Sequence, residues 1–146
     1  MDFIQLLSDA RVPTWVRFPN TSFELLVKQL TTVEIERCRK RAQKNGKVDL
    51  ARMIDAVYRR SVSGVRGMTL AMIEDEFGFD LNGSIIKDDK PIAKDQVITE
   101  EEKISDYWLN FIIGLGATSA KFQYWMLDHT GQNVLTEEEE EAEKKT

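Results

Sequence analysis

Residues 104–130 read ISDYWLNFIIGLGATSAKFQYWMLDHT and hold the most regular apolar spacing in the chain, so they are the strongest indicator of its fold. Apolar side chains recur there at intervals of three and four residues, which places them on one face of an α-helix. Gly114 and Gly116 are expected to end this helix, and Thr118 or Ser119 to cap a second one. Two aromatic-rich helices in succession predict an αα-hairpin that forms much of the core. The stripe of the first helix is Ile104, Tyr107, Trp108, Phe111, Ile112 and Leu115.

Three shorter helices are predicted upstream of this stretch. Thr31 and Glu34 form a capping box for a helix that runs to about Lys44. Apolar spacing then predicts a second helix over residues 48–62 and a third over residues 69–77.

A pair of strands is predicted near the beginning of the chain. Residues 14–18 and 22–28 show partial apolar alternation on either side of a turn that contains Pro and Asn, which favours a β-hairpin. Two strands alone are marginal in water, so the hairpin is expected to pack on the helices or on another subunit. Residues 63–67 are expected to end the helix of residues 48–62, and residues 78–98 are interpreted as either a long loop or a small ribbon.

These elements together predict a mainly α, α+β fold, in which an N-terminal β-hairpin packs on a small helical domain of about five helices. Residues 1–133 are expected to form this single domain. Residues 134–146 are expected to be a disordered acidic tail, because a run of glutamates cannot bury apolar area. Thr99 and Glu102 supply a second capping box in front of the long aromatic helix.

Charge is strongly segregated along the 146 residues, whose formal net charge is −5. Residues 37–60 hold nine basic residues against two acidic ones, a local balance of +7. Residues 74–106 hold eleven acidic residues against four lysines, and residues 136–146 add six glutamates against two lysines. A dipolar surface of this kind steers association with charged partners or with further copies of the chain.

Catalytic and metal-binding motifs fail on inspection. Cys38 and His129 are the single cysteine and the single histidine, so neither a zinc site nor a histidine-based triad can be assembled. The glycines of residues 114–121 fit no nucleotide-binding motif, and residues 78–89 fit no calcium loop. We therefore expect no enzyme, no cofactor and no metal.

Neither a signal peptide nor a membrane span is recognisable, which predicts a cytoplasmic protein without a membrane partner.

The order of these motifs resembles the tail assembly chaperones of long-tailed bacteriophages and their prophage relatives. The resemblance covers roughly residues 14–130. It is carried by the hairpin, a Leu-Thr-x-x-Glu helix start at residues 30–34, a basic helix, the segment VSGVRGMT at residues 62–69, and aromatic helices near the end. A tryptophan is frequent in the family where this chain has Val65, and the charged loop of residues 78–98 is longer than usual.

The resemblance implies a non-catalytic role in the cytoplasm of the host cell. Such chaperones bind the long helical tape-measure protein during tail assembly, keep it soluble and help to recruit tail-tube subunits. They are absent from the mature virion, and some are also made in a longer form by ribosomal frameshifting. Because a marginal hairpin invites self-association, a homo-oligomer is a further expectation.

The candidate protein-binding residues are aromatic and basic side chains, with plain core packing as the competing interpretation of the aromatic ones. Two other functions stay open: a structural tail or head completion protein, and a nucleic-acid-binding regulator that uses the basic face of residues 37–60. Nucleic acid is disfavoured by the isoelectric point near 5.0. The candidates are Trp15, Phe18, Arg37, Arg41, Trp108 and Trp125, of which Trp125 is the leading one for client contact.

Overall fold

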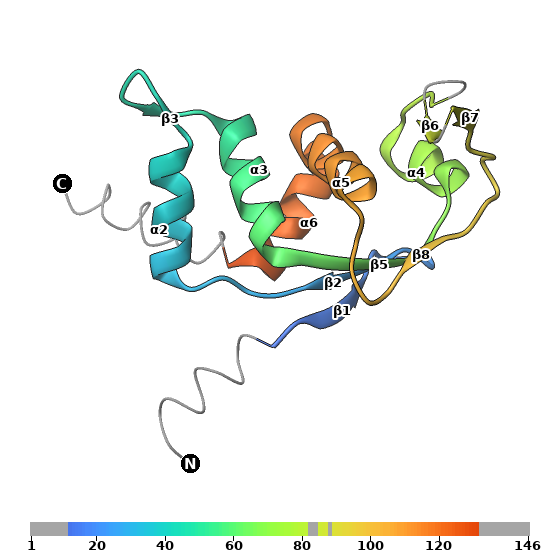
Figure 1. Ribbon diagram of the computed structural model, residues 1–146, viewed down its shortest axis with the longest axis horizontal. Coiled ribbons are helices and arrows are strands. Elements are labelled where there is room, and N and C mark those ends of the chain that lie inside the picture. The colour runs from blue at the N-terminus through green and yellow to red at the C-terminus, as the bar shows by residue number, and fades with distance from the viewer. Residues whose placement is uncertain (1–11, 82–84, 88, 132–146) are drawn as a thin grey trace, which may run out of the picture.

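The structure, a computed structural model, describes residues 12–81, 85–87 and 89–131. Within these residues, five α-helices accompany a four-stranded antiparallel sheet and two small two-stranded ribbons (Figure 1). The α+β class expected from the sequence is therefore confirmed. The predicted acidic tail of residues 134–146 lies outside the described residues. Within them, no helix combines the length and the apolar character that a membrane crossing requires.

The main sheet has the strand order β1-β2-β5-β8. The predicted hairpin is present, since β1 (Thr14–Arg17) and β2 (Glu24–Val27) pair antiparallel with Trp15 opposite Leu26. Residues 63–67 end the second predicted helix as expected, since α3 (Leu50–Ser61) stops before them, but they also belong to a strand that was not predicted, β5 (Val62–Met68). This strand pairs with β2 on one side and with β8 (Ile98–Glu100) on the other, so it is a central strand.

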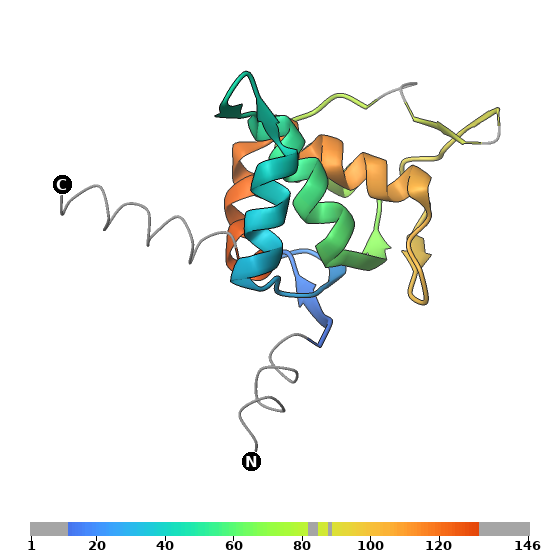
Figure 2. The same ribbon diagram turned by 60° about the vertical axis from the view of Figure 1, so that its left-hand side comes forward.

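The helices are α2 (Thr32–Arg41), α3 (Leu50–Ser61), α4 (Leu70–Phe77), α5 (Asp106–Thr118) and α6 (Ala120–Thr130). Figures 1 and 2 show α2, α3, α5 and α6 gathered over one face of the sheet. In Figure 1, α2 lies at one end of the long axis of the molecule, and α4 lies at the opposite end beside β6 and β7. The basic helix α2 is thereby separated from α4 and from the β6–β7 ribbon, which lies in the acidic stretch of residues 74–106.

Helix α2 begins as predicted and ends earlier than predicted. Both hydrogen bonds of the capping box are formed: Glu34 N donates to Thr31 Oγ1 at 3.0 Å, and Thr31 N donates to Glu34 Oε1 at 3.2 Å. The expected extension to Lys44 is wrong, because Asn45 and Gly46 take positive φ values and turn the chain back on itself. A ribbon results, made of β3 (Gln43–Lys44) and β4 (Lys47–Val48).

The predicted cap of the aromatic helix is also wrong. Thr99 lies in β8, and Ser105 is the residue that caps α5, with its Oγ accepting from Trp108 N at 3.4 Å. Glu100 holds this serine in place by accepting from both its N and its Oγ at 2.8 Å. Thr99 and Glu102 cannot form the box because strand pairing with β5 holds Thr99 in extended backbone.

Helix α5 continues through Gly114 and Gly116 to Thr118, so the prediction that these glycines end it is wrong. Ser119 joins the two helices, since its N donates to Leu115 O at 2.9 Å and its Oγ accepts from Phe122 N at 3.2 Å. The αα-hairpin itself is confirmed. Its second helix, α6, ends at a glycine with left-handed backbone.

Residues 78–98, for which loop and ribbon were both open, contain a small ribbon made of β6 (Ile86–Lys87) and β7 (Lys90–Pro91). The remaining described residues of this segment follow an irregular path until β8. Ile92 N donates to Ile85 O at 3.1 Å, which extends the pairing by one further bond.

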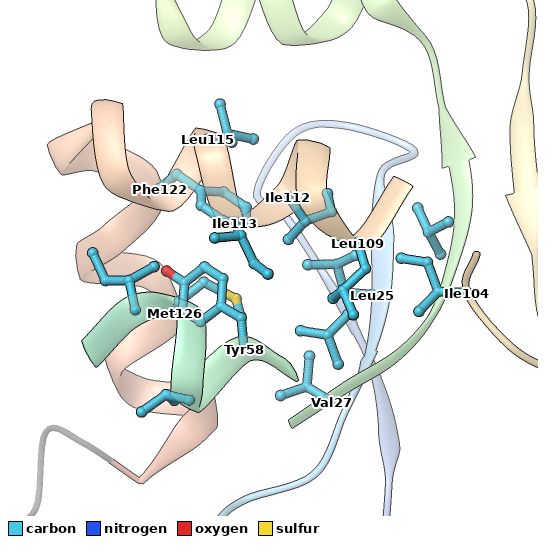
Figure 3. Close-up of a cluster of buried hydrophobic side chains, with 14 of the residues drawn as sticks. Leu25, Val27, Tyr58, Ile104, Leu109, Ile112, Ile113, Leu115, Phe122 and Met126 are labelled. Carbon is cyan, nitrogen blue, oxygen red and sulfur yellow. The ribbon is translucent and has the colours of Figure 1, made fainter. Parts of the chain in front are cut away.

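The core lies between the sheet and the helices. Alternate residues of β2 are buried against the helices, and α3, α5 and α6 supply the opposing side chains. Figure 3 shows these side chains pointing into one cluster. Its labelled members are Leu25, Val27, Tyr58, Ile104, Leu109, Ile112, Ile113, Leu115, Phe122 and Met126.

Candidate protein-binding surfaces

Trp15 lies on the face of the sheet that points away from the helices. The guanidinium carbon of Arg66 lies 4.0 Å from the centroid of the Trp15 ring, and the same guanidinium donates to both carboxylate oxygens of Glu24 at 3.3 and 3.2 Å. These hydrogen bonds, aided by the charges of Arg66 and Arg17 against the cost of burial, lower the pKa of Glu24. Trp15 is therefore half-buried, with the guanidinium of Arg66 over its ring.

Phe18 and Trp125, two of the candidate contact residues, pack on each other. Their ring centroids are 5.1 Å apart in an edge-to-face arrangement, and Trp125 also packs on Phe122 at 5.7 Å. Phe18 is only 3% exposed, whereas Trp125 is half-buried. The pair fastens the turn of the β-hairpin to α6, and only its Trp125 half has surface that a partner could touch.

His129 also packs on Trp125, with ring centroids 4.8 Å apart in an edge-to-face arrangement. Burial lowers the pKa of His129, and the neighbouring carboxylate of Asp128 opposes this effect. The neutral imidazole is thus favoured beside the indole. A partner that covered Trp125 would bury this histidine further.

Trp108 belongs to the core. It is 3% exposed and packs edge-to-face between Tyr107 and Phe111 of its own helix, at 5.0 and 5.5 Å. For Trp108, as for Phe18, the placement agrees with the core-packing interpretation, and neither side chain offers a surface to a client in this conformation.

The basic candidates Arg37 and Arg41 are exposed one turn apart on α2. Arg60 of α3 lies across the helix seam from them, and Arg37 and Arg60 line the same hollow, of about 500 Å³, at the start of α2. Burial raises the pKa of the Cys38 thiol, and the charges of Arg60 and Arg41 oppose that effect. Two helices thus bring their cations to one face, which we call the basic face, defined by Arg37, Lys40, Arg41 and Arg60.

An apolar groove between α4 and α5 is the surface that sequence reasoning missed. Its cavity of about 360 Å³ is bordered by Asp80, Asn110 and Thr118. Gly114 leaves one side open, because apart from its chain neighbours and the backbone of its own helix no atom lies within 4 Å of the position that a Cβ would take. The segments that meet here are more than 25 residues apart in sequence, so no local pattern marks the groove. Its apolar lining is Ile73, Phe79, Leu81, Phe111 and Leu115.

No group of three or more His, Cys, Asp or Glu side chains is placed to hold a metal ion in the part of the chain that the structure describes. Cys38 is fully buried, and its raised pKa disfavours the thiolate that a nucleophile requires.

Comparison with known proteins supplies no relative: no family model, no curated protein and no solved structure matches the chain. Function is therefore inferred from the surfaces themselves, namely the apolar groove, the half-buried Trp125 and the basic face.

Proposed function

We propose that this chain is a non-catalytic tail assembly chaperone that binds the tape-measure protein through the α4–α5 groove and helps to recruit tail-tube subunits in the host cytoplasm. The observation that carries the proposal is the groove, an apolar hollow between α5 on one side and Ile73 of α4 with residues 79–81 on the other. The motif order of residues 14–130 adds the resemblance to the chaperone family. A protein that acts only during assembly is absent from the mature virion.

The groove suits the apolar stripe of an amphipathic helix. Recognition of this type inserts apolar side chains, spaced three and four residues apart, between two helices of the receptor. Phe111 and Phe79 supply half-buried aromatic walls, and Leu81 is also half-buried. A long helical client that exposes such a stripe aggregates in water unless the stripe is covered.

The charges around the α4–α5 groove indicate which kind of client helix binds best. Glu74 and Glu76 are already paired with Lys94 and Lys121, each at 3.0 Å. Asp75 is exposed beside them. An apolar stripe flanked by lysine or arginine is therefore the preferred ligand, because an acidic surface near the groove guides the encounter with a basic partner.

The test is co-expression with the tape-measure protein of the same phage, followed by size-exclusion chromatography with light scattering. Gly114→Gln places a longer side chain in the open side of the groove, whereas Gly114→Ala adds a single methyl group at the same position. We expect the wild type and Gly114→Ala to keep the client in solution and co-elute with it, and Gly114→Gln to lose it.

Two results would contradict the proposal in different ways. Equal client binding by Gly114→Gln and Gly114→Ala would move the client site away from the groove. Failure of the wild type to bind the client at both low and high salt would remove the chaperone function itself. Detection of the chain in purified virions by mass spectrometry would instead favour a structural completion protein.

The basic face favours a second candidate, a regulator that binds nucleic acid. Four cations from α2 and α3 on one face could contact successive phosphates, and such binding weakens steeply as salt rises. Titration of duplex DNA at two salt concentrations separates this candidate from the chaperone, whose apolar contacts with the client depend little on salt.

A further inference from the structure

The cations of the basic face have no anionic partner within the described residues. Both acidic side chains of α2 are already engaged: Glu34 accepts from Thr31 N at 3.2 Å and lies 4.0 Å from Lys28 Nζ, and Glu36 pairs with Arg39 at 3.7 Å. Across the described chain, no carboxylate lies within 4.0 Å of the side chains of Arg37, Lys40, Arg41 or Arg60.

The chain leaves the fold beside this face. Leu30 N, just before the start of α2, donates to Thr130 O at 3.0 Å. The packing there is close, since a Cβ at Gly131 would lie 2.9 Å from Leu30 O. The segment that follows Gly131 therefore starts at the N-terminal end of α2, next to the hollow that Arg37 and Arg60 line.

The segment that follows Gly131 has the length and the negative charge needed to bind the basic face. Residues 137–143 carry six glutamates and no basic residue. In extended chain, the distance from Gly131 to Glu137 can reach about 20 Å. Helix α2 is only about 15 Å long from end to end. The glutamates can thus reach every cation of the face from the point where the chain leaves the fold.

We propose that the acidic segment of residues 137–143 binds the basic face of its own chain, over Arg37 and Arg60, and competes there with an acidic partner. The segment acts as an intramolecular competitor of that partner. It competes effectively because an intramolecular ligand is present at an effective concentration on the order of millimolar. The basic face is then open only to a ligand that outcompetes the segment. This proposal does not depend on the tape-measure protein being the client.

The test uses the full chain and a fluorescently labelled hexaglutamate peptide as probe. In the tail-neutral variant, the glutamates at positions 137–141 and 143 are replaced by glutamine. We expect the tail-neutral variant to bind the probe roughly tenfold more tightly than the wild type at low salt, because the internal competitor is weakened. Adding Arg37→Gln and Arg60→Gln to the tail-neutral variant should remove this gain.

The matched control is Lys90→Gln with Lys103→Gln in the tail-neutral variant. Both lysines are exposed and lie in the acidic part of the sequence, so the net charge changes equally while the basic face stays intact. This control should keep the tighter binding. Amide chemical shifts at positions 37 and 60, compared between wild type and tail-neutral protein, give a second readout that needs no arginine variant.

Three outcomes would overturn the proposal. Wild-type and tail-neutral proteins could bind the probe equally, with the same amide shifts at positions 37 and 60. The lysine control could lose binding as fully as the arginine variant, which would reduce the effect to net charge. Protection of the face in the wild type could disappear on dilution, which would assign the acidic segment to a neighbouring copy.

Discussion

Gly116, in the middle of α5, lies directly against the ring of Tyr58 from α3. A Cβ at position 116 would lie 2.6 Å from the Tyr58 hydroxyl oxygen, closer than any real Cβ contact allows. Tyr58 is 1% exposed, so its ring has no room to retreat. The glycine thus sets how closely α3 and α5 approach each other, and it does so without ending its helix.

Gly116→Ala should therefore destabilise the protein. We expect a loss of about 2 kcal/mol in the free energy of unfolding, within the usual range for overpacking a core. Gly114→Ala in the same helix is the matched control, because its methyl group meets open space. That change should raise stability by about 0.5 to 1 kcal/mol through helix propensity alone. Urea unfolding followed by circular dichroism measures both, and equal effects would refute the role of the Tyr58 contact.

The hydroxyl of Tyr58 should be dispensable for stability. It is buried and has no hydrogen-bond partner among the described residues, and burial raises the pKa of this phenol. A buried polar group without a partner costs roughly 1 to 3 kcal/mol. Tyr58→Phe is therefore expected to stabilise the fold by about 1 kcal/mol in the same unfolding assay. A clear loss of stability would mean that the hydroxyl binds a partner in solution.

Acid should weaken the packing around His129. Because burial lowers the pKa of this imidazole below its ordinary value of 6.5, the unfolded chain binds a proton more readily than the folded one. Stability is then full above pH 6.5 and falls as the pH drops from 6.5 to the folded-state pKa. Glu24, whose pKa is lowered from 4.5, adds its own loss only below that value.

The two contributions can be separated by substitution. His129→Gln should flatten the pH dependence of the unfolding free energy between pH 6.5 and 4.5 and leave the loss at lower pH in place. Since the chain contains one histidine, its pKa can also be read directly by NMR titration. A folded-state pKa at or above 6.5 would contradict the expected direction.

Even a conservative replacement of Arg66 should lower the stability of the protein. Arg66→Lys keeps the charge but loses both the planar stack on Trp15 and the two-pronged contact with Glu24. We expect a loss of about 0.5 to 1 kcal/mol in unfolding free energy, with the pKa of Glu24 moving back toward its ordinary value. Arg17→Lys is the control, because Arg17 is 66% exposed and lies 3.7 Å from the same carboxylate. Equal losses in the two variants would contradict this account.

Local chemistry is enough to locate several elements from the sequence. The capping box of Thr31 and Glu34 and the hairpin of β1 and β2 could be predicted because the interacting groups lie close together along the chain. The αα-hairpin could be predicted for the same reason, since one helical face repeats every three or four residues.

The candidate binding surfaces could be predicted only in part from the sequence. The placement of Arg37 and Arg41 on one helical face follows from their spacing, but the approach of Arg60 depends on how α3 packs on α2. Aromatic character alone could not separate Phe18 and Trp108, which are buried, from Trp125, which is half-buried. The α4–α5 groove has no signature in any single segment.

The α+β class, the helix starts at Thr31 and Thr69 and the segregation of charge all follow from the order of residues along the chain. The central strand of residues 62–68 does not, because a strand needs partners and both of its partners are distant in sequence. Nor does the position of Gly116 inside a helix, because the reason for that glycine is the ring of Tyr58. Hydrogen bonds and side-chain spacing within one segment are local, whereas strand pairing and close packing depend on what the rest of the folded chain brings alongside.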